Sequence, residues 1–222
     1  MKRLLVALAM FWVVPALAEE APKPDYTTAV GICQLIDAAA EKHGLPKSFF
    51  ARLIWKESRF DIKAVSPAGA QGVAQFMPAT AKRRGLADPF DPEQAIPASA
   101  SLLADLKAAY GNFGLAAAAY NAGSGRVDKW RAGRSGLPGE TRGYVYDITG
   151  RPAAWFREKG REVEAKPLAK GEAFVKSCPE MKVIGTRASL RPRWGVIVAG
   201  GRSRRAALTA FERARRQMPS LI

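Results

Sequence analysis

Helical periodicity over residues 31–159 is the feature that most constrains the fold of this chain. The alternation of apolar and polar residues that marks a half-buried strand does not occur before residue 180. The sequence therefore predicts a mainly α domain. Apolar side chains recur three or four residues apart in this stretch, beginning with Ile32, Leu35, Ile36 and Ala39.

Glycine and proline residues set the expected helix ends. Gly44 ends the first helix, and Pro46 opens a second that continues to Arg59. A loop rich in glycine, proline and serine follows, from Asp61 to Pro78. The almost wholly apolar helix at 115–122 should be buried in the middle of the domain. Further helices are expected at residues 92–110, with a restart at Pro97 left open, and at residues 142–148 and 153–159.

The first 18 residues have the pattern of a secretory signal. Lys2 and Arg3 precede an apolar run, and Ala16-Leu17-Ala18 offers small residues at a cleavage site. The alternative is a membrane anchor, but the run is shorter than the roughly 20 residues that a span needs. We therefore expect a periplasmic or secreted protein that does not span the membrane, with a flexible leader at residues 19–30.

The two cysteines, Cys33 and Cys178, suit an exported chain, in which one disulfide can form. The alternative is a pair of buried thiols. A disulfide would tie the start of the helical domain to the C-terminal segment. With only one histidine, His43, the chain lacks the ligand pattern of a zinc site, so we expect no metal and no cofactor.

The positive charge is concentrated towards the C-terminus. The formal net charge is +15, and from Arg151 onward 17 Lys and Arg face 6 Asp and Glu. Such an excess favours an anionic partner. Export argues against nucleic acid and favours anionic cell-wall polymers, although a basic helix without a specific partner remains the alternative. We expect a charged linker at residues 160–180 and a basic β-α appendage at residues 181–222.

Glu57 is the strongest candidate for a catalytic residue. It lies at the C-terminal end of an apolar helix, where the helix dipole and apolar neighbours disfavour a negative charge and raise a carboxyl pKa. A general acid that works near neutral pH needs such a raised pKa. The alternative is a surface glutamate paired with Lys56 or Arg59.

Four motifs follow one another in a fixed order and identify a family. The chain closely resembles the soluble lytic transglycosylases over residues 31–159, which implies a lysozyme-like fold. The resemblance rests on Glu57-Ser58 with Ser66 nine residues on, Gly72-Val73-Ala74-Gln75-Phe76-Met77-Pro78, Ala119-Tyr120-Asn121-Ala122-Gly123 and Glu140-Thr141-Arg142-Gly143-Tyr144-Val145.

The resemblance implies a role for each matched residue. Glu57 takes the catalytic position, and Ser66 and Tyr120 take positions that orient this glutamate and the sugar. Gln75 lines the glycan groove, Asn121 supports the same site and Tyr144 closes it. The family usually has Leu-Met where this chain has Val73-Ala74, which implies a roomier subsite at Ala74.

The number of carboxylates indicates the reaction. Ordinary glycosidases use two carboxylates about 5–10 Å apart, whereas the motifs supply one, because Asp61 is expected to be a turn residue. The resemblance implies that the 6-hydroxyl of N-acetylmuramic acid attacks its own anomeric carbon, which gives a 1,6-anhydro end. Two alternatives are a hydrolytic muramidase on the same fold and a non-catalytic protein that binds peptidoglycan.

The tail bears a weaker resemblance to half of a SPOR domain, a module that binds glycan strands. It rests on a strand-like segment, Trp194-Gly195-Val196-Ile197-Val198, and the basic helix expected at 203–217. The expected partners are therefore peptidoglycan glycan strands and anionic wall polymers. The role is either wall turnover or opening of the wall for a secretion system or flagellum.

Overall fold

The domain begins at Thr28, whose side chain accepts a hydrogen bond from Gly31 N at 3.1 Å and caps the first helix. The computed structural model describes residues 24–164, 166–181 and 209. Helix α1 (Ala29–His43) ends at Gly44, and α2 (Lys47–Ser58) follows after Pro46. The capping threonine starts α1 two residues earlier than the sequence predicted, so the leader is shorter than 19–30.

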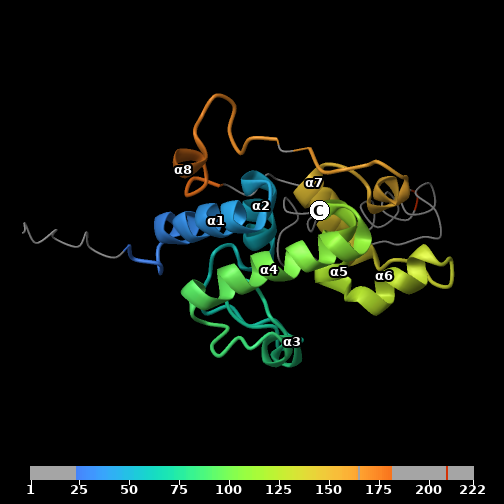
Figure 1. The fold of residues 1–222 in the computed structure, drawn as a ribbon, viewed down its shortest axis with the longest axis horizontal. Helices are drawn as coiled ribbons and strands as arrows, with labels where there is room; N and C mark the ends of the chain where they lie inside the picture. The colour runs from blue at the N-terminus through green and yellow to red at the C-terminus, as the bar shows by residue number, and fades with distance from the viewer. Residues whose placement is uncertain (1–23, 165, 182–208, 210–222) are drawn as a thin grey trace, which may run out of the picture.

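Helix α4 packs against helices from the beginning and the middle of the domain. It runs from Pro92 to Tyr110, is capped by the Asp91 side chain, and contacts both α1 and α5 (Figure 1). The helix continues through Pro97 without a restart, because its neighbours Ile96 and Ala100 are fully buried and hold it against the core. The short α3 (Pro78–Arg83), which the sequence analysis did not predict, precedes it.

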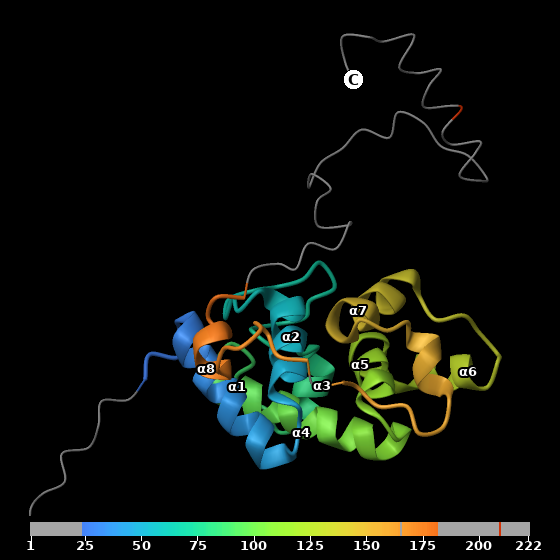
Figure 2. The same cartoon turned by 90° about the horizontal axis from the view of Figure 1, so that it is seen from above.

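Helix α5 (Phe113–Ala122) forms the centre of the core, as the sequence predicted. It contacts α4, α6 (Ser124–Arg131), α7 (Gly139–Thr149) and the 3-10 helix η1 (Ala153–Arg157), which surround it in Figure 2. Gly114 allows the closest of these contacts, because a Cβ there would lie 2.2 Å from the Phe156 ring. The final segment is a 3-10 helix and not the longer helix predicted for 153–159.

Residues 160–164 and 166–181, which we call the C-terminal strap, pack on the domain. The sequence analysis predicted a linker here, and the described residues of the strap make specific contacts with the domain. Near its start Glu162 accepts a hydrogen bond from Phe113 N at 2.9 Å. In its middle the Arg52 guanidinium donates to the carbonyl groups of Lys166 and Pro167 at 3.0 and 2.9 Å. These contacts attach the strap to α5 and α2.

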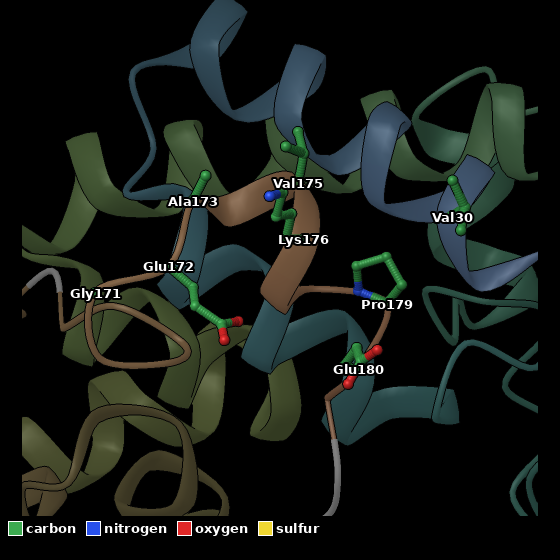
Figure 3. Close-up of a pocket in the computed structure, with 8 residues that line it drawn as sticks. All are labelled: Val30, Gly171, Glu172, Ala173, Val175, Lys176, Pro179 and Glu180. Atoms are coloured by element: carbon green, nitrogen blue, oxygen red, sulfur yellow. The ribbon is translucent and has the colours of Figure 1, made fainter.

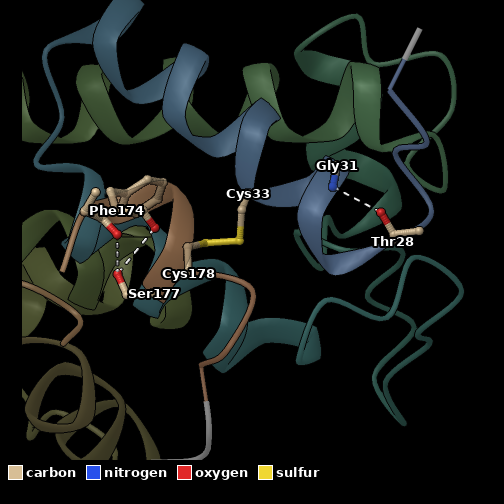
Figure 4. Close-up of a disulfide and its surroundings, with 7 residues drawn as sticks. Thr28, Gly31, Cys33, Phe174, Ser177 and Cys178 are labelled. Atoms are coloured by element: carbon tan, nitrogen blue, oxygen red, sulfur yellow. Dashed lines mark hydrogen bonds between the residues drawn. A yellow bond between two sulfur atoms is a disulfide. The ribbon is translucent and has the colours of Figure 1, made fainter. Parts of the chain in front are cut away.

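A disulfide fixes the far end of the strap. Cys178 follows the short helix α8 (Phe174–Ser177) and is bonded to Cys33 of α1, with the Cα atoms 5.9 Å apart (Figure 4). Both cysteines are buried. The bond closes a loop over a sequence separation of 145 residues, so it ties the strap covalently to the first helix of the domain.

The described residues confirm the mainly α fold. β pairing within them is limited to two isolated bridges, Val65 with Gln71 and Gln71 with Phe76. None of their helices is both long and apolar enough to cross a bilayer. The predicted signal, residues 1–18, lies outside the described residues. So does the predicted β-α appendage, residues 181–222, except for Met181 and Thr209.

Candidate active site

Glu57 is the next-to-last residue of α2 and is half-buried. Tyr144, from the middle of α7, donates a hydrogen bond from its hydroxyl to Glu57 Oε1. Burial is the main influence on the carboxyl group and raises the pKa of Glu57 to about 7. The Tyr144 hydrogen bond and the charge of Lys56 oppose this rise, and the charge of Glu140 adds to it. Near neutral pH, Glu57 can therefore both give and accept a proton.

The backbone after Glu57 is strained. Arg59 and Phe60 have φ values of 57° and 66°, in the left-handed region that side chains with a Cβ rarely adopt. Phe60 is buried and meets Trp55 edge to face, with the ring centroids 5.0 Å apart. The aromatic packing holds the turn that ends α2, which begins two residues after Glu57, and so helps to fix where the carboxylate lies.

The loop that follows is held together by its own polar side chains. Ser66 Oγ accepts from Ala70 N at 3.0 Å, and Gln75 Nε2 donates to the carbonyl groups of Ala64 and Gly72 at 3.1 and 2.9 Å. Gln75 is itself in the left-handed region, with φ 51°. Both predicted substrate-binding residues of this loop therefore shape its backbone, and neither hydrogen-bonds to Glu57.

Gly72 makes a tight approach possible beneath this loop. Its φ is 71°, and a Cβ there would lie 1.8 Å from the carbonyl oxygen of Pro89. Only glycine fits at this position. The motif glycine therefore serves the packing of the loop on the segment that leads into α4.

Tyr120 links this loop to the core. Its hydroxyl donates to Ala74 O at 2.8 Å and lies 3.0 Å from Ser99 Oγ of α4. Burial, and then the charge of Glu57, raise the pKa of Tyr120. Tyr120 is thus a neutral, fixed group that lies close enough to interact electrostatically with Glu57. Ala74 is fully buried at this contact, and the roomier subsite implied by its small side chain stays a prediction.

Asn121 contributes to the site through α7. Its Oδ1 accepts from Thr141 Oγ1 at 2.7 Å, and Thr141 lies one turn before Tyr144 on the same helix. The contact therefore sets the position of α7 against the end of α5. Thr141 and Ser99 were not predicted as supports of the site, although both are buried polar residues.

Glu57 and Tyr120 both lie in a part of the chain that matches a known family. The family model of the transglycosylase SLT domain matches residues 26–141, which include Glu57, the glycine-rich loop and the end of α5. The chain belongs to the transglycosylase SLT domain family.

Relatives of this SLT-domain chain match about half of it. The transglycosylase of Enterobacteria phage PRD1 is 34% identical over 48% of this chain and 40% of its own length. The membrane-bound lytic murein transglycosylase F of Desulfosudis oleivorans is 36% identical over 46% of this chain and 24% of its own. The solved 70 kDa soluble lytic transglycosylase of Escherichia coli is 32% identical, with a TM-score of 0.48, over 56% of this chain and 24% of that one. The chain thus spans less than half of these relatives.

Two other carboxylates among the described residues, Asp61 and Glu140, bear on whether Glu57 acts alone. Asp61 is exposed, and its Oδ1 accepts from Lys63 N at 2.9 Å, so it is a turn residue as predicted. Glu140, at the exposed start of α7, is the carboxylate whose charge acts on Glu57. The described residues contain no cluster of three or more His, Cys, Asp or Glu side chains that could hold a metal ion.

A cavity of about 640 Å³ lies between the start of α1 and the strap (Figure 3). It contains none of the predicted site residues and is not the candidate active site. Its lining is Val30, Gly171, Glu172, Ala173, Val175, Lys176, Pro179 and Glu180.

Proposed function

We propose that this chain is an exported lytic transglycosylase that cleaves the bond between N-acetylmuramic acid and N-acetylglucosamine in peptidoglycan. The observation that carries the proposal is the state of Glu57, a half-buried carboxyl group with a pKa raised to about 7 and a tyrosine hydroxyl on one of its oxygens. The names of the relatives, lytic murein transglycosylases among them, support the same substrate.

The reaction needs one carboxyl group that acts twice. Protonated Glu57 donates its proton to the glycosidic oxygen as the bond from the anomeric carbon breaks. The resulting carboxylate accepts the proton of the 6-hydroxyl of the same muramic acid, whose oxygen bonds to the anomeric carbon. No water is consumed, and Glu57 is protonated again at the end. Because the nucleophile belongs to the sugar being cleaved, the attack has the advantage of proximity.

The other site residues have supporting roles in this proposal. Tyr144 holds the Glu57 carboxylate in one orientation and stabilises its charged form between the two proton transfers. Tyr120 holds the loop against the core and faces Glu57 as a neutral group. Ser66, Gln75 and Asn121 give the sugar-binding surface its shape, through the loop and through α7.

The test replaces Glu57 with glutamine and uses Glu140→Gln as the matched control. Glutamine is nearly isosteric but cannot transfer a proton at neutral pH, so cleavage of purified sacculi should fall by roughly 10²–10⁴-fold. Glu140→Gln should retain most of the activity, since that side chain is exposed and acts on Glu57 only through its charge. Wild-type cleavage by the Glu57→Gln protein would contradict the proposal.

A further inference from the structure

A second contact joins α2 and α7 beside the one that Tyr144 makes with Glu57. Lys56 Nζ lies 2.6 Å from Asp147 Oδ2. Lys56 and Glu57 are neighbours on α2, and Tyr144 and Asp147 are three residues apart on one face of α7. The two helices are therefore linked at two consecutive residues, once through the proposed acid and once through the cation next to it.

The position of this cation matters because it lies beside a carboxyl group that must hold a proton. Four titratable groups face or act on Glu57: Lys56 from its own helix, Tyr144 and Glu140 from α7, and Tyr120 from α5. Lys56 is the one cation among them, and its charge lowers the pKa of Glu57. A lysine that swung over to pair with Glu57 would hold the carboxylate charged and unable to act as an acid.

We propose that Asp147 is a positioning residue, which holds the Lys56 ammonium group away from the Glu57 carboxylate and so keeps Glu57 able to carry the proton that it donates. The proposal rests on the proposed function of Glu57. Asp147 suits the role because its side chain is only 19% exposed, whereas that of Lys56 is 42% exposed. The more buried carboxylate thus holds the more exposed ammonium group.

Opposite shifts in the pH profile test this role. Asp147→Asn frees the lysine, so the alkaline limb of the kcat/KM profile on sacculi should move to lower pH. Lys56→Gln removes the cation, so the same limb should move to higher pH. Each shift should be roughly half a pH unit, as expected for a partly exposed pair. The double variant should return close to the wild-type profile, and Lys56→Arg should leave the limb in place.

A matched pair of control variants separates charge from mere stability. Lys47 pairs with Asp37 at 2.8 Å and joins the other end of α2 to α1. Lys47→Gln and Asp37→Asn should leave the pH profile unchanged, although each loses a similar ion pair. Thermal unfolding of every variant shows whether it is folded at the assay temperature.

The outcomes are distinguishable from those of the proposed function. The positioning role is wrong if the alkaline limbs of Asp147→Asn and Lys56→Gln move in the same direction, or if neither moves. It is also wrong if the double variant does not return towards the wild-type profile. That result leaves Glu57 as the acid if Glu57→Gln is inactive. If Glu57→Gln is active, the proposed function itself fails. If Asp147→Asn does not fold, Lys56→Gln alone provides the test. The alkaline limb of its pH profile must still move to higher pH.

Discussion

The hydroxyl group of Tyr144 reaches the Glu57 carboxylate from a residue 87 positions later in the chain. This hydrogen bond favours the charged form of Glu57 and lowers its pKa against the effect of burial. Tyr144→Phe should therefore raise the pKa of Glu57 and move the alkaline limb of the pH profile to higher pH. Cleavage at pH 7 should fall on the order of tenfold, because a hydrogen bond to a charged group is lost.

Tyr146, two residues further along α7, provides the control for that change. It is exposed, so Tyr146→Phe should leave both the rate and the pH profile unchanged. Equal rates for the Tyr144→Phe and wild-type proteins across the pH range would show that Tyr144 does not assist Glu57.

The raised pKa of Glu57 should also appear in the pH dependence of folding. The unfolded chain loses the Glu57 proton near pH 4.5 and the folded chain near 7, so the free energy of unfolding falls as pH rises between these values. Glu57→Gln removes this effect. We expect the variant to be more stable than the wild type at pH 8, by about 1–3 kcal/mol, and equally stable at pH 4. Urea unfolding at both pH values measures the difference, and a constant difference would contradict the raised pKa.

The Cys33–Cys178 bond should contribute much of the stability of the domain. It restricts the unfolded chain over a sequence separation of 145 residues. Removing a disulfide that closes so long a loop costs about 3–5 kcal/mol of folding stability. Paired Cys33→Ser and Cys178→Ser changes should lower the free energy of unfolding by that amount. The reduced wild type should behave in the same way. Two free thiols in unreduced periplasmic protein would show that the bond does not form in the cell.

Residues 182–222 should bind the wall and take no part in catalysis. This segment carries 10 Lys and Arg and one Glu, and exposed charges are screened beyond roughly 8 Å at physiological ionic strength. A chain that ends after Met181 should keep its turnover of short soluble glycans. Its binding to sacculi should weaken and lose most of its salt dependence. Binding as tight as that of the full chain at low salt would show that the tail is no anchor.

The site of that truncation shows what the sequence could not reveal. The charged composition of residues 160–180 predicted a linker, and from that prediction alone the chain would have been truncated near Lys159. The contacts of Arg52 with two carbonyl groups and of Glu162 with Phe113 N are set by tertiary structure. Composition gives no sign of them, so the cut must come after Cys178.

Local patterns predicted the helices that carry strong apolar periodicity or clear caps. The helix expected at residues 92–110 is α4, and the apolar run of α5 marked the centre of the core. Helices α3 and α6 were missed because they are short, with 6 and 8 residues, and because α6 is mostly polar. Within the site, the motifs indicated Glu57 and Tyr144 separately, but nothing local reveals that Asp147 would face Lys56.

The identity of the new glycan end tests the central claim most directly. Purified sacculi are digested with the wild-type protein, and the released muropeptides are analysed by mass spectrometry. The account predicts 1,6-anhydro-N-acetylmuramic acid ends, which lack one water relative to hydrolysed ends, and predicts that they vanish with Glu57→Gln. Mainly reducing ends would contradict the account, because they would mean that water is the nucleophile and that the protein is a muramidase.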